Sequence, residues 1–102
     1  MGPLHTVNKS PFASTALESC LARLTEGAAV LLIEDGVYAA LAAGAAADRL
    51  AEAANRHPVY VLGPDLAARG LAEASLLDGV RVIDYLGFVD LATRHSAVQS
   101  WF

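Results

Sequence analysis

One cysteine, Cys20, is the residue of this chain best suited to covalent chemistry, and it falls inside a predicted helix. At about 100° per residue, Leu17, Leu21 and Leu24 share a narrow arc of that helix, and Cys20 lies about 65° from the centre of the arc. This spacing predicts a thiol at the border between the buried stripe and the polar flank, with Arg23 on the polar side. A nearby cation favours the thiolate, the form that attacks sulfur. The alternative is a small apolar residue that fills the edge of the core, as free cysteines commonly do.

Acidic residues follow three of four predicted strands. The segments after these strands read Asn8-Lys9-Ser10, Glu34-Asp35, Gly63-Pro64-Asp65 and Asp84-Tyr85. Ligands of open parallel sheets bind at the carboxyl ends of the strands, so a magnesium site is one interpretation of these carboxylates. The other is that each aspartate caps the helix that follows it, which is the commoner use of this residue. We favour the caps and predict no metal site.

The other familiar catalytic arrangements are missing. His5, His57 and His95 are scattered, and with one cysteine they do not have the spacing of zinc ligands. Gly63 stands beside a proline that lacks an N–H group, so no glycine-rich phosphate loop is formed there. No serine lies in a glycine-flanked nucleophile elbow. We therefore expect no metal and no organic cofactor, and Cys20 is the single candidate catalytic residue.

Short apolar runs alternate with helical patterns along the chain, which is typical of βα units around a mostly parallel sheet. The predicted strands are Leu4–Val7, Val30–Ile33, Val59–Leu62, Val80–Ile83 and, as an edge strand or an apolar tail, Val98–Phe102. No internal repeat and no linker interrupts this pattern. The sequence therefore predicts one small three-layer α/β domain over residues 1–102, with four to five mostly parallel strands.

Capping residues mark the predicted helices. Thr15 with Glu18 three positions later matches a capping box and predicts a helix from Ala16 to Gly27. The other helices are predicted to start at aspartates: after Asp35 to about residue 43, after Asp48 to before Pro58, after Asp65 to Gly70, and from Asp84 to about His95.

The composition indicates a subunit of an assembly. Apolar residues make up 55% of the 102 residues and charged residues 18%, whereas roughly 45–50% and 25% are usual. A small domain has much surface for its volume, so the surplus apolar area is best covered by another subunit. The alternative is that alanine inflates the apolar share, as in the segment Ala39 to Ala47. The net charge of −4 and the lack of a basic cluster exclude direct binding of nucleic acid.

Location follows from three further features of the sequence. The longest weakly polar run, Val37 to Ala47, is far shorter than the roughly 20 residues of a membrane span. Met1 to Phe12 has neither the basic nor the apolar region of a signal peptide. A single cysteine forms no internal disulfide, which fits a reducing compartment. We expect a cytoplasmic protein without a membrane partner.

Several blocks of the sequence together resemble the DsrH/TusB family of sulfur-relay subunits. The resemblance is carried by Leu4–Phe12, Leu17–Leu21, Glu26–Gly27, Val30–Ala40, Val59–Leu66, Ala68–Gly70, Val82–Tyr85, Gly87–Leu91 and Val98–Phe102. It covers nearly the whole chain except the alanine-rich middle. The resemblance implies a DsrE-like fold and membership in a dimer of heterotrimers with DsrE/TusD-like and DsrF/TusC-like subunits.

Such complexes pass persulfide sulfur to a small DsrC/TusE-like acceptor, either in sulfur oxidation or for thiolation of the tRNA wobble uridine. The resemblance assigns the principal persulfide cysteine to the DsrE/TusD-like subunit. DsrH-type members resemble this chain in having a cysteine at the position of Cys20, whereas TusB-type members often lack it, so we lean towards sulfur oxidation. The resemblance implies that the chain is part of a sulfurtransferase complex, and we do not expect it to be a complete enzyme by itself.

Three hypotheses follow. In the first, a Cys20 thiolate exchanges sulfur with a partner persulfide, with Arg23 and Lys9 as local positive charges. In the second, the chain is a non-catalytic scaffold subunit of the same type of complex serving 2-thiolation of the tRNA wobble uridine, in which Trp101 and Phe102 support assembly. The third is a separate metal-binding or small-molecule-binding domain that uses the acidic residues Glu34, Asp35, Asp65 and Asp84.

Overall fold

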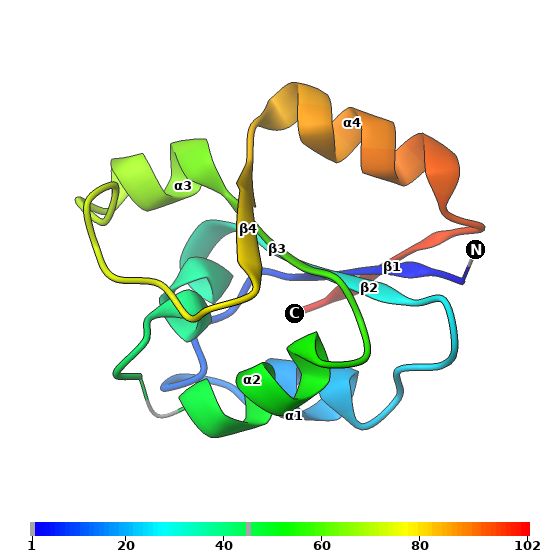
Figure 1. Ribbon diagram of the computed structural model, residues 1–102, viewed down its shortest axis with the longest axis horizontal. Helices are drawn as coiled ribbons and strands as arrows, with labels where there is room; N and C mark the ends of the chain where they lie inside the picture. Colours follow the sequence, from blue (N-terminus) through cyan, green and yellow to red (C-terminus); the bar gives the residue numbers. More distant parts are fainter. Residues whose placement is uncertain (1, 45) are drawn as a thin grey trace.

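Five short strands form one parallel sheet in the order β4-β3-β2-β1-β5, with helices on both faces (Figure 1). The computed structural model describes residues 2–44 and 46–102; Met1 and Ala45, which lie in the predicted domain and its alanine-rich segment, are outside the described residues. The strands are β1 Leu4–Val7, β2 Ala29–Leu32, β3 Val59–Leu62, β4 Val80–Ile83 and β5 Val98–Trp101. The predicted three-layer α/β fold is confirmed.

Strands β2 and β3 are continuous apolar runs, which explains why they were predictable, whereas β1 also contains the buried polar residues His5 and Thr6. All four residues of β1 and of β2 are buried, as expected for strands of a parallel sheet that is covered on both faces. Two bounds differ from the prediction. Strand β2 begins at Ala29, which pairs with Leu4, so it lies one residue earlier than expected. The C-terminal segment, predicted as an edge strand or an apolar tail, forms the edge strand β5, which pairs in parallel with β1 and ends at Trp101, one residue before the predicted end.

The sheet separates two cores. The larger core lies between one sheet face and residues of α1 Ala16–Leu21, the 3₁₀-helix η1 Glu34–Ala40, α2 Ala47–Ala54 and α3 Gly63–Ala68. The smaller core lies on the opposite face, under Phe88 and Leu91 of α4 Tyr85–Arg94. Figure 1 shows α1 and α2 together on one side of the sheet and α4 on the other. Each described helix is too short or too polar to cross a membrane.

The helix ends differ from their predicted positions more than the strands do, and α1 is the first example. Thr15 flanks α1 but makes no side-chain cap bond; instead the Ser14 Oγ accepts a hydrogen bond from the Ala16 N–H at 3.0 Å. The helix ends at Leu21 instead of Gly27, because the chain tightens into a turn in which the Arg23 N–H donates to the Cys20 carbonyl at 3.0 Å.

The aspartate caps were predicted correctly once in four. Asp84 accepts a hydrogen bond from the Gly87 N–H at 2.8 Å and caps α4 as expected. Asp48 and Asp65 lie inside the first turns of α2 and α3, whose caps are Ala46 and Leu62. Asp35 lies inside η1, a 3₁₀-helix that ends at Ala40 where an α-helix to about residue 43 was predicted. Gly70, which was predicted to close the helix that follows Asp65, has the expected positive φ of 71°.

Candidate functional site

Cys20 is completely buried. Its side chain is 0% exposed and belongs to the larger core, with Ala16 and Leu17 as its buried neighbours on α1. Two surface hollows flank this helix, with volumes of about 430 and 270 Å³, and Cys20 lines neither of them. The prediction that the thiol lies at an accessible border was therefore wrong.

The surroundings of Cys20 favour the thiol over the thiolate. Burial raises the pKa of Cys20 from its ordinary value of 9.0 to about 12, because the charged form would lose its hydration. Arg23 does not offset this effect. Its guanidinium donates to the Ser19 carbonyl at 3.3 Å and lies over the Trp101 ring, 5.8 Å from the ring centroid. Lys9 lies exposed in the loop after β1.

Arg23 and Trp101 belong to a polar chain that also includes His5. The Trp101 indole N–H donates to Nδ1 of His5 at 2.9 Å, so the proton of the neutral imidazole resides on Nε2. That Nε2 is buried and has no hydrogen-bond partner among residues 2–44 and 46–102. Burial, with a smaller contribution from His57, lowers the pKa of His5 below 6.5. Burial of His5 on β1 thus favours the neutral form of the imidazole.

This contact joins residues from opposite ends of the chain. His5 on β1 and Trp101 on β5 meet because the two strands pair in parallel, with Val7 opposite Trp101. From the sequence alone, His5 is one of three scattered histidines and Trp101 is predicted only to support assembly. No local pattern signals a contact 96 positions apart, so only the pairing of the strands reveals it.

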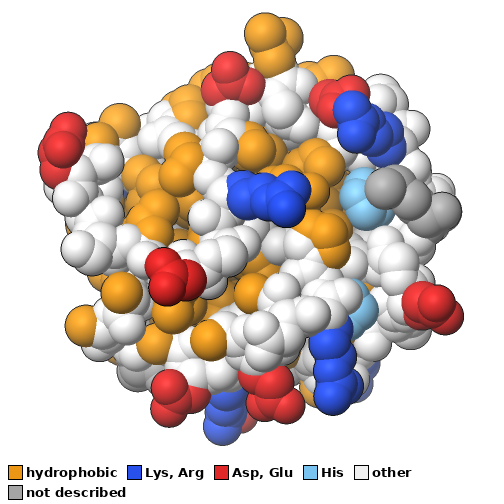
Figure 2. All heavy atoms as spheres, in the orientation of Figure 1, with side chains coloured by type: hydrophobic (Ala, Val, Ile, Leu, Met, Phe, Trp, Pro, Cys, Tyr) orange, Lys and Arg blue, Asp and Glu red, His pale blue; other side chains and the backbone are white. Residues whose placement is uncertain are grey.

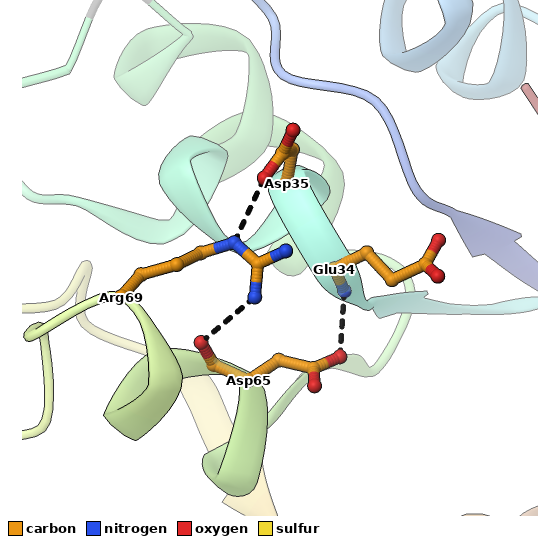
Figure 3. Close-up of polar contacts among 4 residues, drawn as sticks. All are labelled: Glu34, Asp35, Asp65 and Arg69. Carbon is orange, nitrogen blue, oxygen red and sulfur yellow. Dashed lines mark hydrogen bonds and ion pairs between the residues drawn. The ribbon is translucent and has the colours of Figure 1, made fainter.

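A second polar cluster lies at the carboxyl ends of β2 and β3 (Figure 3). The Asp65 carboxylate accepts a hydrogen bond from the Glu34 N–H at 2.6 Å. Asp35 accepts from Arg69 Nε at 2.8 Å, and Nη1 of the same guanidinium donates to the Asp65 carbonyl at 3.2 Å. Arg69, which the sequence analysis did not single out, therefore ties η1 to α3.

The geometry of this cluster is better suited to holding η1 against α3 than to binding a metal ion. Both aspartates already have protein partners, and the Glu34 carboxylate points away from them in Figure 3. Asp84, the fourth predicted acid, is engaged in capping α4. No three histidine, cysteine or acidic side chains among residues 2–44 and 46–102 come together as metal ligands. Glu34 has a φ of 49°, an uncommon conformation that the surrounding contacts hold.

Comparisons with known proteins agree with this fold. The family model for DsrH-like proteins matches residues 9–98. Protein TusB of Pectobacterium parmentieri is 41% identical over 98 residues, which is 96% of this chain and 99% of that protein. Protein TusB of Shigella flexneri is 39% identical over the same shares. The crystal structure of the ychN protein from E. coli superposes with a TM-score of 0.80 over 99% of this chain and 100% of that one. Its 19% identity carries the likeness of fold alone.

Proposed function

Because this chain belongs to the DsrH family, we propose that it works as one subunit of a sulfur-relay complex. The observation that carries the proposal is the family match over residues 9–98, together with 41% identity to a TusB protein along nearly the whole chain. The chain's own features support it. Its one cysteine is buried, Asp35, Asp65 and Asp84 are engaged in structural contacts, and its share of charged residues is only 18%.

The companions we propose are those that the family resemblance implies. A DsrE/TusD-like and a DsrF/TusC-like subunit would complete a dimer of heterotrimers in the cytoplasm, and a small DsrC/TusE-like protein would accept the sulfur. In the transfer, an acceptor thiolate attacks the outer sulfur of a cysteine persulfide. The donor S–S bond breaks, a new S–S bond forms on the acceptor, and the donor leaves as a thiolate, so no external oxidant or reductant is needed.

For this chain we propose a supporting role in that transfer, with the persulfide carried by the DsrE/TusD-like companion. A carrier thiol needs access and thiolate character. Cys20 has a completely buried side chain, and burial raises its pKa to about 12. The sulfur-carrying role predicted for Cys20 stays a prediction, and it requires α1 to move away from β1 and β5.

We propose the tRNA-thiolation branch, because the similar proteins are named TusB. The sulfur-oxidation branch is the second candidate, and the presence of Cys20 favours it, since the DsrH-type resemblance includes a cysteine at this position.

Co-expression of the tagged full-length chain with the two companion subunits tests the proposal. We expect one stable complex that contains all three chains in equal amounts, and we expect its persulfide form to transfer sulfur to the acceptor. A chain that never co-purifies with either companion would refute the relay role. Deletion of the gene then separates the branches, because loss of 2-thiouridine in tRNA supports the first and loss of stored-sulfur oxidation supports the second.

A further inference from the structure

The strand and helix at one edge of the molecule expose more apolar side chains than any other described segment. Val82 of β4 is 55% exposed, and Tyr85, Leu86 and Val89 of α4 are 59%, 79% and 62% exposed. They make up four of the seven large apolar side chains that are exposed among the described residues. We call these four residues the β4–α4 surface. Figure 2 shows hydrophobic side chains gathered around the part of the molecule where β4 lies in front.

The backbone at this place is also open. Within the described part of the chain, strand β4 pairs only with β3, in continuous register from Val80 to Ile83, and it contains neither a bulge nor a proline. Natural proteins usually protect an exposed edge strand with a bulge, a proline or charged side chains. In β4 the only charged side chain is that of Arg81. A hollow of about 500 Å³ lies where β4 meets α4, lined by Gly63, Pro64, Val82, Ile83, Asp84 and Gly87.

Charges indicate which kind of protein covers this surface. Arg81, in the middle of β4, is exposed and takes part in none of the ion pairs among the described residues. Within residues 80–94 both carboxylates are engaged, because Asp84 caps α4 and Asp90 pairs with Arg94 at 2.8 Å. A second copy of the chain would therefore bring another unpaired guanidinium, and the Asp84 carboxylate of that copy would already accept the hydrogen bond that caps α4. A different chain with an acidic residue fits better.

We propose that the β4–α4 surface is the docking face for a companion subunit that covers it with apolar side chains and places a carboxylate against Arg81. The four apolar side chains together expose on the order of 400 Å², about half of the ~800 Å² that each partner contributes to a standard interface. Open strand atoms and the hollow beside Val82 supply the remaining contacts. This proposal rests on the proposed relay function and names the surface through which it assembles.

The test uses the full-length chain co-expressed with the DsrE/TusD-like and DsrF/TusC-like subunits. Leu86→Glu buries a charge in the interface, and we expect at least a tenfold weaker association. Arg81→Glu places two negative charges together, and its effect is expected to be larger at low salt than at high salt. Ala72→Glu adds the same charge at an exposed position outside the surface and serves as the matched control.

Circular dichroism and thermal melting of each variant alone establish that it folds, which we expect because Leu86 and Arg81 are exposed. Hydrogen exchange of the wild-type complex is expected to slow over residues 80–94. If the wild type assembles and both surface variants assemble equally well, the docking face is overturned while the relay role stands. If the wild type binds neither companion, the docking face and the relay role are both overturned. If the wild type forms a homodimer that Leu86→Glu abolishes, a second copy is the occupant and our choice of partner is overturned.

Discussion

Moving the single cysteine by two positions should change its reactivity by more than an order of magnitude. Cys20 is completely buried, whereas Ala22, at the end of the same helix, is exposed. A Cys20→Ala, Ala22→Cys double variant therefore carries one thiol on the same element in the opposite environment. We expect the native wild-type chain to react with a thiol reagent far more slowly than this variant.

The size of the difference follows from the pKa of Cys20. Burial raises it from 9.0 to about 12, so near neutral pH the thiolate fraction is about a thousandfold lower than that of an unperturbed thiol. A more basic thiolate is a stronger nucleophile, with a Brønsted coefficient of about 0.4–0.5, which recovers roughly 15- to 30-fold. The net effect of the pKa is about a 30- to 60-fold slower reaction. Steric closure of the core adds to this ratio.

The assay is the release of thionitrobenzoate from Ellman's reagent at pH 7.5, with the wild type and the double variant measured side by side. Both should react at the same rate in strong denaturant, which controls for the local sequence. In the native state we expect the wild type to be at least 30-fold slower. Native rates within a factor of three of each other would show that Cys20 is accessible, and the reasoning from burial would be refuted.

Three further predictions concern other parts of the structure. The lowered pKa of His5 means that the unfolded chain binds its proton more readily, so stability should fall as the pH drops below 6.5. His5→Asn, which keeps an acceptor for Trp101, should reduce that loss between pH 7.5 and 5.5 in denaturant titrations, and an unchanged loss would contradict the assignment. A Cβ on Gly36 would lie 2.1 Å from the Val7 carbonyl oxygen, so Gly36→Ala should cost about 3 kcal/mol or more in thermal or chemical unfolding. Gly44→Ala, whose Cβ would lie 3.3 Å from its nearest atom, should cost clearly less, and equal costs would count against the close approach. Calorimetric titration with millimolar Mg²⁺ should give no saturable heat, because Asp35 and Asp65 are already bonded to the protein; a saturable signal would restore the metal hypothesis.

The strands were predictable because short segments rich in apolar and β-branched residues lie between turn residues. Leu4–Val7, Val59–Leu62 and Val80–Ile83 have the predicted bounds. Helix starts were less predictable, since capping depends on contacts that the local pattern does not contain. Asp35 accepts a hydrogen bond from Arg69, which lies 34 positions away in the sequence. Asp65 accepts one from the backbone N–H of Glu34, which lies 31 positions away.

The error over Cys20 has a definite geometric cause. The expected arc was centred on Leu17, Leu21 and Leu24, but α1 ends at Leu21, and both Leu21 and Leu24 are only partly buried. The buried positions of the helix are instead Ala16, Leu17 and Cys20, which lie on one helical face at spacings of one, three and four residues. The expected arc left out Ala16, and the burial of Ala16 places Cys20 near the centre of the buried face.

Mapping sulfur on the assembled complex tests our central claim most directly. The complex of this chain with its two companions is loaded with a persulfide donor, trapped by alkylation and analysed by mass spectrometry, with the wild type and Cys20→Ala measured in parallel. We predict persulfide on a companion cysteine, none on Cys20, and equal rates of transfer to the acceptor. Persulfide on Cys20, with transfer lost in Cys20→Ala, would contradict the supporting role and make this chain a carrier.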